Sequence, residues 1–138
     1  MKSSIYNCGI LQLPKIHNRA GNITALENNI HLPFEVKRVF YLYDVPAGEG
    51  RGGHAHQELQ QIVVATSGAF DVLLDDGTNK KMVHLDRPFK GLHIVAGIWA
   101  ELLNFSSGAV CLVLASHKYD EKDYIRNYRD FLAYKQNG

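Results

Sequence analysis

The sequence predicts an all-β protein, built as an antiparallel sandwich or barrel, with one α-helix at its C-terminal end. From about residue 5 to residue 116, short apolar, β-branched and aromatic runs alternate with Gly, Asp, Asn or Pro, which is typical of many short antiparallel strands. After residue 118 the chain is rich in charge and repeats aromatic residues at helical spacing. A length of 138 residues with 46% hydrophobic residues suits a single domain, with the β-body over 1–118 and the helix over 119–135.

The expected strands follow in order from the apolar runs and the turns between them. Asp75-Asp76-Gly77 predicts a hairpin turn, because Asp-Gly supplies the positive φ that such a turn requires. Ser106-Ser107-Gly108 predicts another turn of this kind. Arg51–His56 is expected to be extended. The other strands are expected at Val36–Tyr43, Ile62–Ala65, Phe70–Leu74, Met82–Leu85, Leu92–Ala96, Trp99–Phe105 and Val110–Ala115.

The final segment predicts a helix that lies against the β-body. Tyr124, Tyr128 and Phe131 recur at spacings of four and three, which places them on one helical face. Asp120 or a neighbour can cap the N-terminus of this helix, and acidic residues fill its first turn.

Composition and charge limit the classes of partner. Fifteen basic and 14 acidic side chains nearly balance, so no broad electrostatic surface for nucleic acid or an anionic membrane is expected. No apolar run approaches the roughly 20 residues needed to span a bilayer, and no secretory leader is visible. Cys8 and Cys111 are too few and too far apart for a disulfide scaffold. We therefore expect a soluble, cytoplasmic protein.

His54 and His56 form the most informative motif of the chain. Side chains two residues apart on an extended segment point to the same face, so the two imidazoles meet at one wall. Such a pair can bind a metal ion or transfer protons. The alternative is a pair of structural histidines that bond to polar groups of the β-body.

The pair opens a pattern that resembles the two-part signature of cupin barrels. That signature has His-x-His, Glu and Gly, followed tens of residues later by Pro-x-Gly-x-x-His-x-x-x-Asn. Here His54, His56, Gly68, Gly97 and Asn104 match, whereas Gln61, Val95 and Ala100 stand where the signature has Glu, Pro and His. The resemblance implies a cupin (jelly-roll) antiparallel β-barrel without two of the four usual metal ligands. Because catalytic transition metals generally need three protein ligands, we expect no metal.

Beyond the barrel signature, the chain resembles the sugar-nucleotide 3,4-ketoisomerases, which include enzymes acting on thymidine-diphosphate (dTDP)-linked 4-keto-6-deoxyglucose. The resembling segments run in order along nearly the whole chain, at residues 21–27, 33–41, 51–56, 73–77, 97–99, 104–106, 113–116, 119–121 and 123–126. The resemblance implies a metal-independent isomerase that moves a ketone from carbon 4 to carbon 3 through an enediol, without a cofactor. It also implies a role in deoxysugar biosynthesis for surface polysaccharide, with a dTDP-linked keto sugar as partner.

The same resemblance assigns the acid–base chemistry to His54 and His56, with His56 favoured as the base. Histidine has an ordinary pKa near 6.5 and can take and return a proton near neutral pH. Because a carbon acid is much weaker than imidazolium, donors must stabilise the developing oxyanion, and Arg38, Tyr41 and Gln61 are candidates. Arg38 and Tyr41 lie on opposite faces of one strand, so they cannot both line a cavity without a bulge or twist.

Two further side chains are candidates for nucleotide binding. The planar fork of Arg51 suits the oxygens of a diphosphate at the mouth of the cavity. Trp99 could stack on a sugar or base ring, or it could be a core aromatic residue. The resemblance also implies a homodimer, and the apolar run Ile10–Leu13 is compatible with strand addition at a sheet edge.

Some positions depart from the family pattern. Ala20 and Ala100 replace large polar residues, which enlarges the expected sugar site and removes hydrogen bonds, and Phe40 stands where the family often has Tyr. Two alternatives therefore remain beside the ketoisomerase. One is a dTDP-sugar 3,5-epimerase-like enzyme, and the other is a non-catalytic cupin that binds nucleotide sugars.

Overall fold

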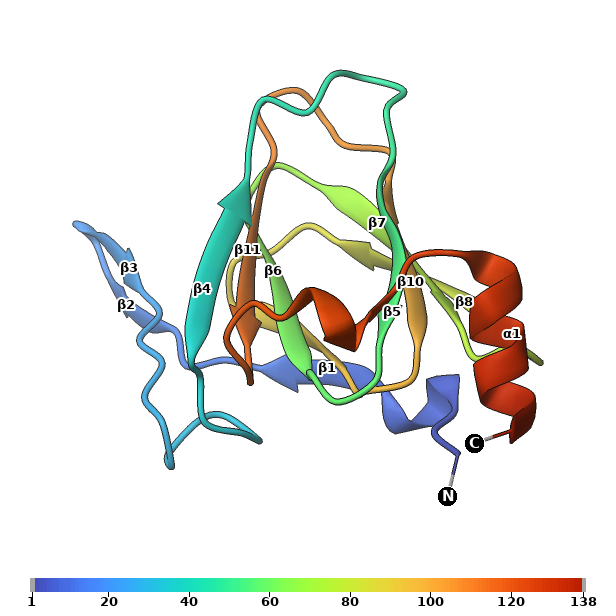
Figure 1. The fold of residues 1–138 in the computed structure, drawn as a ribbon. Helices are drawn as coiled ribbons and strands as arrows, with labels where there is room; N and C mark the ends of the chain where they lie inside the picture. The colour runs from blue at the N-terminus through green and yellow to red at the C-terminus, as the bar shows by residue number, and fades with distance from the viewer. Residues whose placement is uncertain (1, 138) are drawn as a thin grey trace.

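Two five-stranded antiparallel sheets face each other and form a barrel in the computed structural model, which describes residues 2–137 (Figure 1). The first sheet has the strand order β1-β9-β6-β11-β4, and the second has the order β12-β5-β10-β7-β8. Strands β2 and β3 form a separate hairpin. The predicted fold class, an antiparallel cupin-like β-barrel with one C-terminal helix, is confirmed.

The strands agree closely with the predicted runs, and most differ from them by one or two residues at an end. In chain order the strands are β1 (Gly9–Gln12), β2 (Ile16–Asn18), β3 (Gly21–Ile23), β4 (Arg38–Leu42), β5 (Arg51–His56), β6 (Gln61–Ser67), β7 (Phe70–Asp75), β8 (Lys80–Leu85), β9 (Lys90–Ile94), β10 (Trp99–Leu103), β11 (Val110–Ala115) and β12 (Tyr124–Ile125). Two 3-10 helices, η1 (Ile5–Asn7) and η2 (Glu121–Asp123), and the helix α1 (Tyr128–Asn137) complete the fold.

Side-chain alternation along the strands fills the interior of the barrel. Val63 of β6 belongs to the main core together with Phe70 of β7, and Phe70 stacks on Phe105 with ring centroids 5.0 Å apart. Ile62 and Val64 of β6 belong to a second apolar cluster on the other face of the first sheet. The middle of β6 is therefore buried on both faces, which explains the unbroken apolar run Ile62–Ala65. Each such fully buried side chain contributes about 1.5–3 kcal/mol to folding.

The two predicted turns differ in what they connect. The β7–β8 hairpin turns where predicted: Gly77 has a φ of 90°, and the Asp76 carboxylate accepts hydrogen bonds from two backbone N–H groups of the turn. The turn at residues 106–108 is not a hairpin, because β10 and β11 belong to different sheets. Asn104, with a φ of 57°, redirects the chain just after β10 and separates the two strands.

The C-terminal segment differs from the prediction of a helix over 119–135. Helix α1 begins only at Tyr128, and the preceding residues form η2 and the short strand β12. Tyr124 pairs with His56 across the β12–β5 ladder. The free edge of β5 offers backbone hydrogen-bond partners to this segment, and these outweigh the helical spacing of its aromatic residues. Phe131 of α1 is fully buried and packs the helix against the barrel.

The N-terminal part of the chain adds one strand to the barrel and then leaves it. Strand β1 pairs with β9 of its own sheet, so the predicted strand addition occurs within the chain. The β2–β3 hairpin projects from the barrel (Figure 1), and Ile16 and Ile23 on it are 57% and 60% exposed. Within residues 2–137, no helix combines the length and the apolar character needed to cross a membrane.

Candidate active site

A cavity of about 170 Å³ lies inside the barrel, and strands of both sheets contribute to its wall. Its lining consists of Arg38, Phe40, Leu42, Arg51, Gly52, His54, Gln61, Val63, Ile94, Ala100, Leu102, Val113, Tyr124 and Arg126. Three of these residues are arginines, and none of the described lining residues is Asp or Glu. The cavity is therefore suited to an anionic ligand.

The two histidines share one face of β5, as their spacing predicts. Their rings meet edge to face, with centroids 4.9 Å apart. His54 lines the cavity, whereas His56 is 5% exposed and lies outside the lining set. The structure thus places His54 where it can touch a ligand and His56 behind it.

Asp123 fixes the orientation of His56. Nδ1 of His56 donates a hydrogen bond to Oδ2 of Asp123 at 3.1 Å. The same carboxylate accepts hydrogen bonds from the backbone N–H groups of Glu58, at 2.7 Å, and Leu59, at 3.2 Å. An ionised carboxylate can only accept, so Nδ1 of His56 carries the proton and its Nε2 is left as an acceptor.

Burial keeps both histidines neutral near pH 7. The pKa of His54 is lowered to about 4, first by burial and then by the positive charge that His56 can carry. The pKa of His56 is also lowered, because burial outweighs the opposing hydrogen bond and charge of Asp123. A neutral imidazole on the cavity wall is ready to accept a proton.

Tyr124 and Arg126 enter the wall from β12 and the residue that follows it. The Tyr124 ring centroid is 5.0 Å from that of His54 and 4.3 Å from that of His56. The guanidinium of Arg126 lies 4.1 Å from the centre of the Tyr124 ring. Arg126 is held in turn by two hydrogen bonds to Glu121, of 2.6 and 2.9 Å. This segment therefore places a hydroxyl and an oriented cation beside the histidines.

Arg38 has an unsatisfied donor at the cavity. Its guanidinium carbon lies 4.5 Å from the ring centre of Phe40 and 5.1 Å from that of Tyr119. Nη1 of Arg38 is buried and has no hydrogen-bond partner among residues 2–137. A buried donor without a partner costs free energy, and an anionic oxygen in the cavity would remove that cost.

Four of the seven predicted ligand-binding and catalytic residues line the cavity, one lies directly behind its wall, and two lie elsewhere. The lining residues are Arg38, Arg51, His54 and Gln61, while His56 lies directly behind. Tyr41 does not line the cavity: it is 60% exposed on the other face of β4, as strand alternation requires. Trp99 also lies outside, because it packs against Phe131 of α1 and donates Nε1–H to Glu101 at 3.0 Å.

The two alanines that depart from the family pattern, Ala100 and Ala20, lie in different parts of the structure. Ala100 is part of the cavity wall and pairs with His54 across the β10–β5 ladder. Ala20 lies in the exposed turn of the β2–β3 hairpin, outside this cavity. Of the two small residues, only Ala100 therefore leaves room in the cavity of this barrel.

The donor set does not fit the metal that many cupins hold. Ala100 contributes no donor where the cupin signature has a histidine, and Gln61 offers a neutral amide where it has a carboxylate. Among residues 2–137, no three His, Cys, Asp or Glu side chains are placed to hold a metal ion together.

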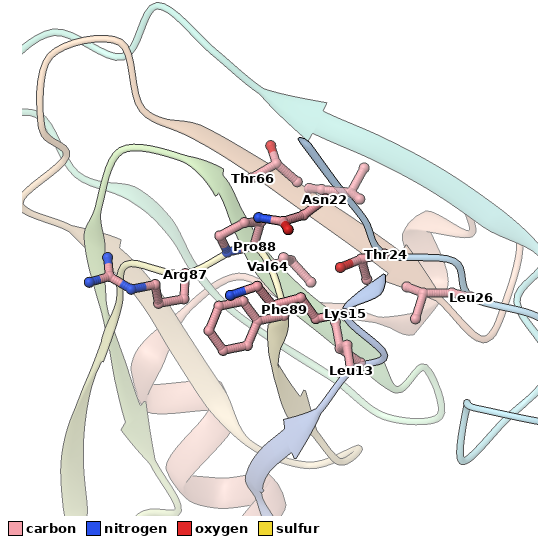
Figure 2. Close-up of a pocket in the computed structure, with 11 residues that line it drawn as sticks. Leu13, Lys15, Asn22, Thr24, Leu26, Val64, Thr66, Arg87, Pro88 and Phe89 are labelled. Atoms are coloured by element: carbon pink, nitrogen blue, oxygen red, sulfur yellow. The ribbon is translucent and has the colours of Figure 1, made fainter. Parts of the chain in front are cut away.

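A larger hollow, of about 530 Å³, lies at the outer face of the first sheet and is shown in Figure 2. Val64 and Leu112 of that face line it, together with Lys15 and Phe89. Neither histidine of the pair contributes to this hollow. The candidate active site is therefore the smaller cavity inside the barrel.

Three residues beside the cavity carry no predicted role: Asp123, Tyr124 and Arg126. They lie in the segment that the aromatic spacing assigns to a helix, and a helix over these residues would have placed them outside the barrel. The alternation of Tyr124 and Arg126 is the available signal, since residues two apart on a strand share one face.

Comparisons with known proteins identify the family of this chain. Residues 6–136 match the family described as FdtA: WxcM-like, C-terminal. The chain is 42% identical to a TDP-4-oxo-6-deoxy-alpha-D-glucose-3,4-oxoisomerase of Aneurinibacillus thermoaerophilus over 125 residues, which cover 91% of this chain and 90% of that protein.

Solved structures show the same relationship. The chain is similar to WlaRB, a TDP-quinovose 3,4-ketoisomerase from Campylobacter jejuni, with 48% identity, a TM-score of 0.88 and coverage of 92% of this chain and 98% of the other. It is also similar to QdtA, a sugar 3,4-ketoisomerase from Thermoanaerobacterium thermosaccharolyticum in complex with TDP, with 35% identity, a TM-score of 0.94 and coverage of 97% and 98%. A 3'-monoepimerase from Streptomyces bikiniensis, 16% identical over 91% of this chain and 72% of that one with a TM-score of 0.77, shares the fold alone.

Proposed function

This chain belongs to the FdtA family and is an enzyme of the 3,4-ketoisomerase class, and we propose that it moves the keto group of a dTDP-linked 4-keto-6-deoxyhexose between carbon 4 and carbon 3. The relatives support this substrate class, because one is named for TDP-4-oxo-6-deoxyglucose and another was solved with TDP. The observation that carries the proposal is the position of neutral His54 on a wall that also holds three arginines. An imidazole can move a proton while arginines bind a diphosphate.

His54 is the proposed base. The carbonyl at carbon 4 acidifies the proton on carbon 3, and His54 removes that proton. The product of this step is the enediolate form of the enediol. The hydroxyl proton on the oxygen of carbon 3 passes to the oxygen on carbon 4, and carbon 4 takes the proton back from His54, which leaves the ketone at carbon 3. We assign this step to His54 rather than to His56, because His54 lines the cavity and His56 lies behind it.

His56 and Asp123 support this base. When His54 takes a proton, positive charge develops 4.9 Å from the ring of His56. The hydrogen bond between His56 and Asp123 brings a carboxylate close to that charge and keeps the His56 ring in one orientation. Both effects favour proton transfer to His54.

The arginines have two proposed roles. Arg38 is the donor for the oxyanion of the enediolate, because its buried Nη1 is free to bind an oxygen in the cavity. Arg51 and Arg126 are the proposed ligands of the diphosphate, since both line the cavity and Arg126 is already oriented by Glu121. Gln61 supplies a further amide on the wall.

Incubation with dTDP-4-keto-6-deoxyglucose in heavy water tests the reaction. We expect the carbonyl signal to move from carbon 4 to carbon 3 in the carbon-13 spectrum, with deuterium at carbon 4 of the product and at carbon 3 of recovered substrate. Deuterium at carbons 3 and 5 would instead identify a 3,5-epimerase. Absence of both the carbonyl shift and any exchange, despite dTDP binding, would identify a non-catalytic cupin.

A pair of histidine variants completes this test. His54→Asn is expected to abolish product formation and to retain dTDP binding. His84→Asn is the matched control, because the His84 side chain is 60% exposed and bonds to Asp71 outside the cavity. Equal activity of His54→Asn and the control would contradict the assignment of the base.

We further propose a homodimer in the cytoplasm that supplies a deoxysugar for surface polysaccharide. Ile16 and Ile23 on the projecting hairpin, and Val39 on the edge strand β4, are apolar side chains that a second copy could cover. Cys8 and Cys111 are free thiols, as expected for a reducing compartment. Light scattering at micromolar concentration tests the assembly, and a monomer mass would contradict it.

A further inference from the structure

Arg38 brings a cation to the cavity wall without an acidic partner among residues 2–137. Its buried Nη1 also lacks a hydrogen-bond partner in this part of the chain. An arginine side chain has many rotamers, so a guanidinium without a polar partner is ordinarily free to move. Contacts of another kind must therefore hold this guanidinium at the cavity.

Two aromatic rings provide these contacts. The guanidinium carbon of Arg38 lies 4.5 Å from the ring centre of Phe40 and 5.1 Å from that of Tyr119. Phe40 is two residues further along β4, so strand alternation places it on the same face as Arg38. Tyr119 follows the end of β11, where Ala115 pairs with Arg38 across the β4–β11 ladder. Aromatic rings bind a guanidinium through its face, so they restrain Arg38 and leave its N–H donors available.

Glu121 is the acidic residue bonded to Tyr119, and other groups already occupy its carboxylate. The Tyr119 hydroxyl donates a hydrogen bond to Oε2 of Glu121, and Arg126 donates to both carboxylate oxygens, at 2.6 and 2.9 Å. These bonds direct Glu121 toward Arg126 and not toward Arg38. Because Arg126 supplies two of the three bonds, Glu121 stays held even without the Tyr119 hydroxyl.

We propose that Tyr119 is a positioning residue, whose ring acts with that of Phe40 to hold the Arg38 guanidinium ready for an oxygen of the substrate. This inference rests on the proposed function, in which Arg38 is the donor for the enediolate oxygen. Tyr119 itself is not among the residues that line the cavity. A donor that is fixed before the substrate binds loses less entropy on binding, so the ring of Tyr119 strengthens the interaction that Arg38 makes.

A double-mutant cycle with Arg38 tests this role. Tyr119→Leu is expected to lower kcat/KM by about tenfold, as for the loss of one cation–π contact in a partly desolvated site. In the Arg38→Met background the same change should have less than about a twofold effect, because no guanidinium remains to be held. An equal loss in both backgrounds would overturn the proposal, since Tyr119 would then act independently of Arg38.

Two further variants separate the ring from the hydroxyl and a local effect from a general one. Tyr119→Phe keeps the ring and is expected to retain kcat/KM within about threefold of wild type. A loss as large as that of Tyr119→Leu would assign the role to the hydroxyl and refute the inference. Tyr6→Leu is the matched control with wild-type kcat/KM expected, because Tyr6 is 76% exposed and lies outside the cavity lining.

A proton spectrum of the free protein tests the contact without any turnover. The Nε–H signal of Arg38, identified by its absence in Arg38→Met, should carry a ring-current shift in wild type and in Tyr119→Phe. In Tyr119→Leu the signal should move toward the position of a free arginine, and an unmoved signal would contradict the proposal. Absence of wild-type turnover refutes the ketoisomerase function itself, whereas an unmoved signal refutes only this inference.

Discussion

His56 donates its Nδ1–H to Oδ2 of Asp123 at 3.1 Å, so a carboxylate on η2 sets the tautomer of a histidine on β5. The two residues are 67 positions apart in the sequence, and the crossing of the C-terminal segment over the edge of β5 brings them together. The tautomer at the centre of the site thus depends on the docking of that segment.

Replacing Asp123 by Asn should lower kcat by about tenfold or more, because the charge near His54 and the fixed tautomer of His56 are both lost. The loss should be smaller than the roughly 100- to 10,000-fold contribution of a group that transfers the proton itself. Steady-state kinetics with nitrogen-15 spectra of the His56 ring measure both effects. Asp130→Asn, on the exposed face of α1, is the control, and wild-type kcat in Asp123→Asn would refute the supporting role.

Arg38→Met should separate function from stability. Removal of a guanidinium that binds the oxyanion is expected to lower kcat/KM by about 100-fold. The free protein should be no less stable, because the buried Nη1 of Arg38 lacks a partner in the described structure. Denaturant midpoints and kinetics of Arg38→Met and of the exposed control Arg129→Met measure this contrast. A large loss of stability would show that Arg38 is structural.

The low pKa of His54 makes stability depend on pH. Its pKa is about 4 in the folded protein and near 6.5 when unfolded, so the unfolded chain binds more protons between these values. The free energy of unfolding should therefore fall as pH drops from 6.5 to 4, by up to about 3 kcal/mol from this residue. Urea titrations at several pH values should show a flatter dependence for His54→Asn than for wild type or His84→Asn. An identical slope in all three proteins would contradict the burial argument.

Lys135→Met should destabilise the fold without altering the chemistry. Lys135 is 8% exposed, and its ammonium donates to the carbonyl oxygens of Ser3, at 2.7 Å, and Gly97, at 3.0 Å. Its loss leaves buried acceptors unpaired, at a cost of about 1–3 kcal/mol. Thermal denaturation measures this cost, with Lys118→Met on the exposed surface as the control. Equal melting temperatures of Lys135→Met and the control would show that the contact contributes nothing.

The sequence predicts the strands of the barrel well, because the position of each strand depends on residues that are close together in the chain. Alternating side chains and turn residues locate the strands, and the hairpin at Gly77 depends on the positive φ that Asp-Gly supplies. The hairpin expected at residues 106–108 fails because strand partners are chosen across the whole barrel. Which sheet β10 and β11 join is not encoded in the turn between them.

The site is predicted in part, for the same physical reason. His54, Arg38 and Gln61 lie on strands whose alternation fixes the face they share, and the conflict foreseen between Arg38 and Tyr41 is resolved in favour of Arg38. The spacing of Tyr124, Tyr128 and Phe131 predicts a helix over this segment. Only the unpaired edge of β5, a tertiary feature, makes that segment a strand.

Strand β12 has two residues, yet the segment around it supplies the aromatic ring of Tyr124, an orienting carboxylate and a cation to the pocket. A ladder this short adds little cooperativity, so its amides should exchange with solvent far sooner than those of the central strands β6 and β11. Local unfolding of this segment can consequently move Asp123, Tyr124 and Arg126 away from the cavity while the barrel stays folded. Substitutions in this short segment can also change the groups that face the cavity without changing the packing of the barrel interior.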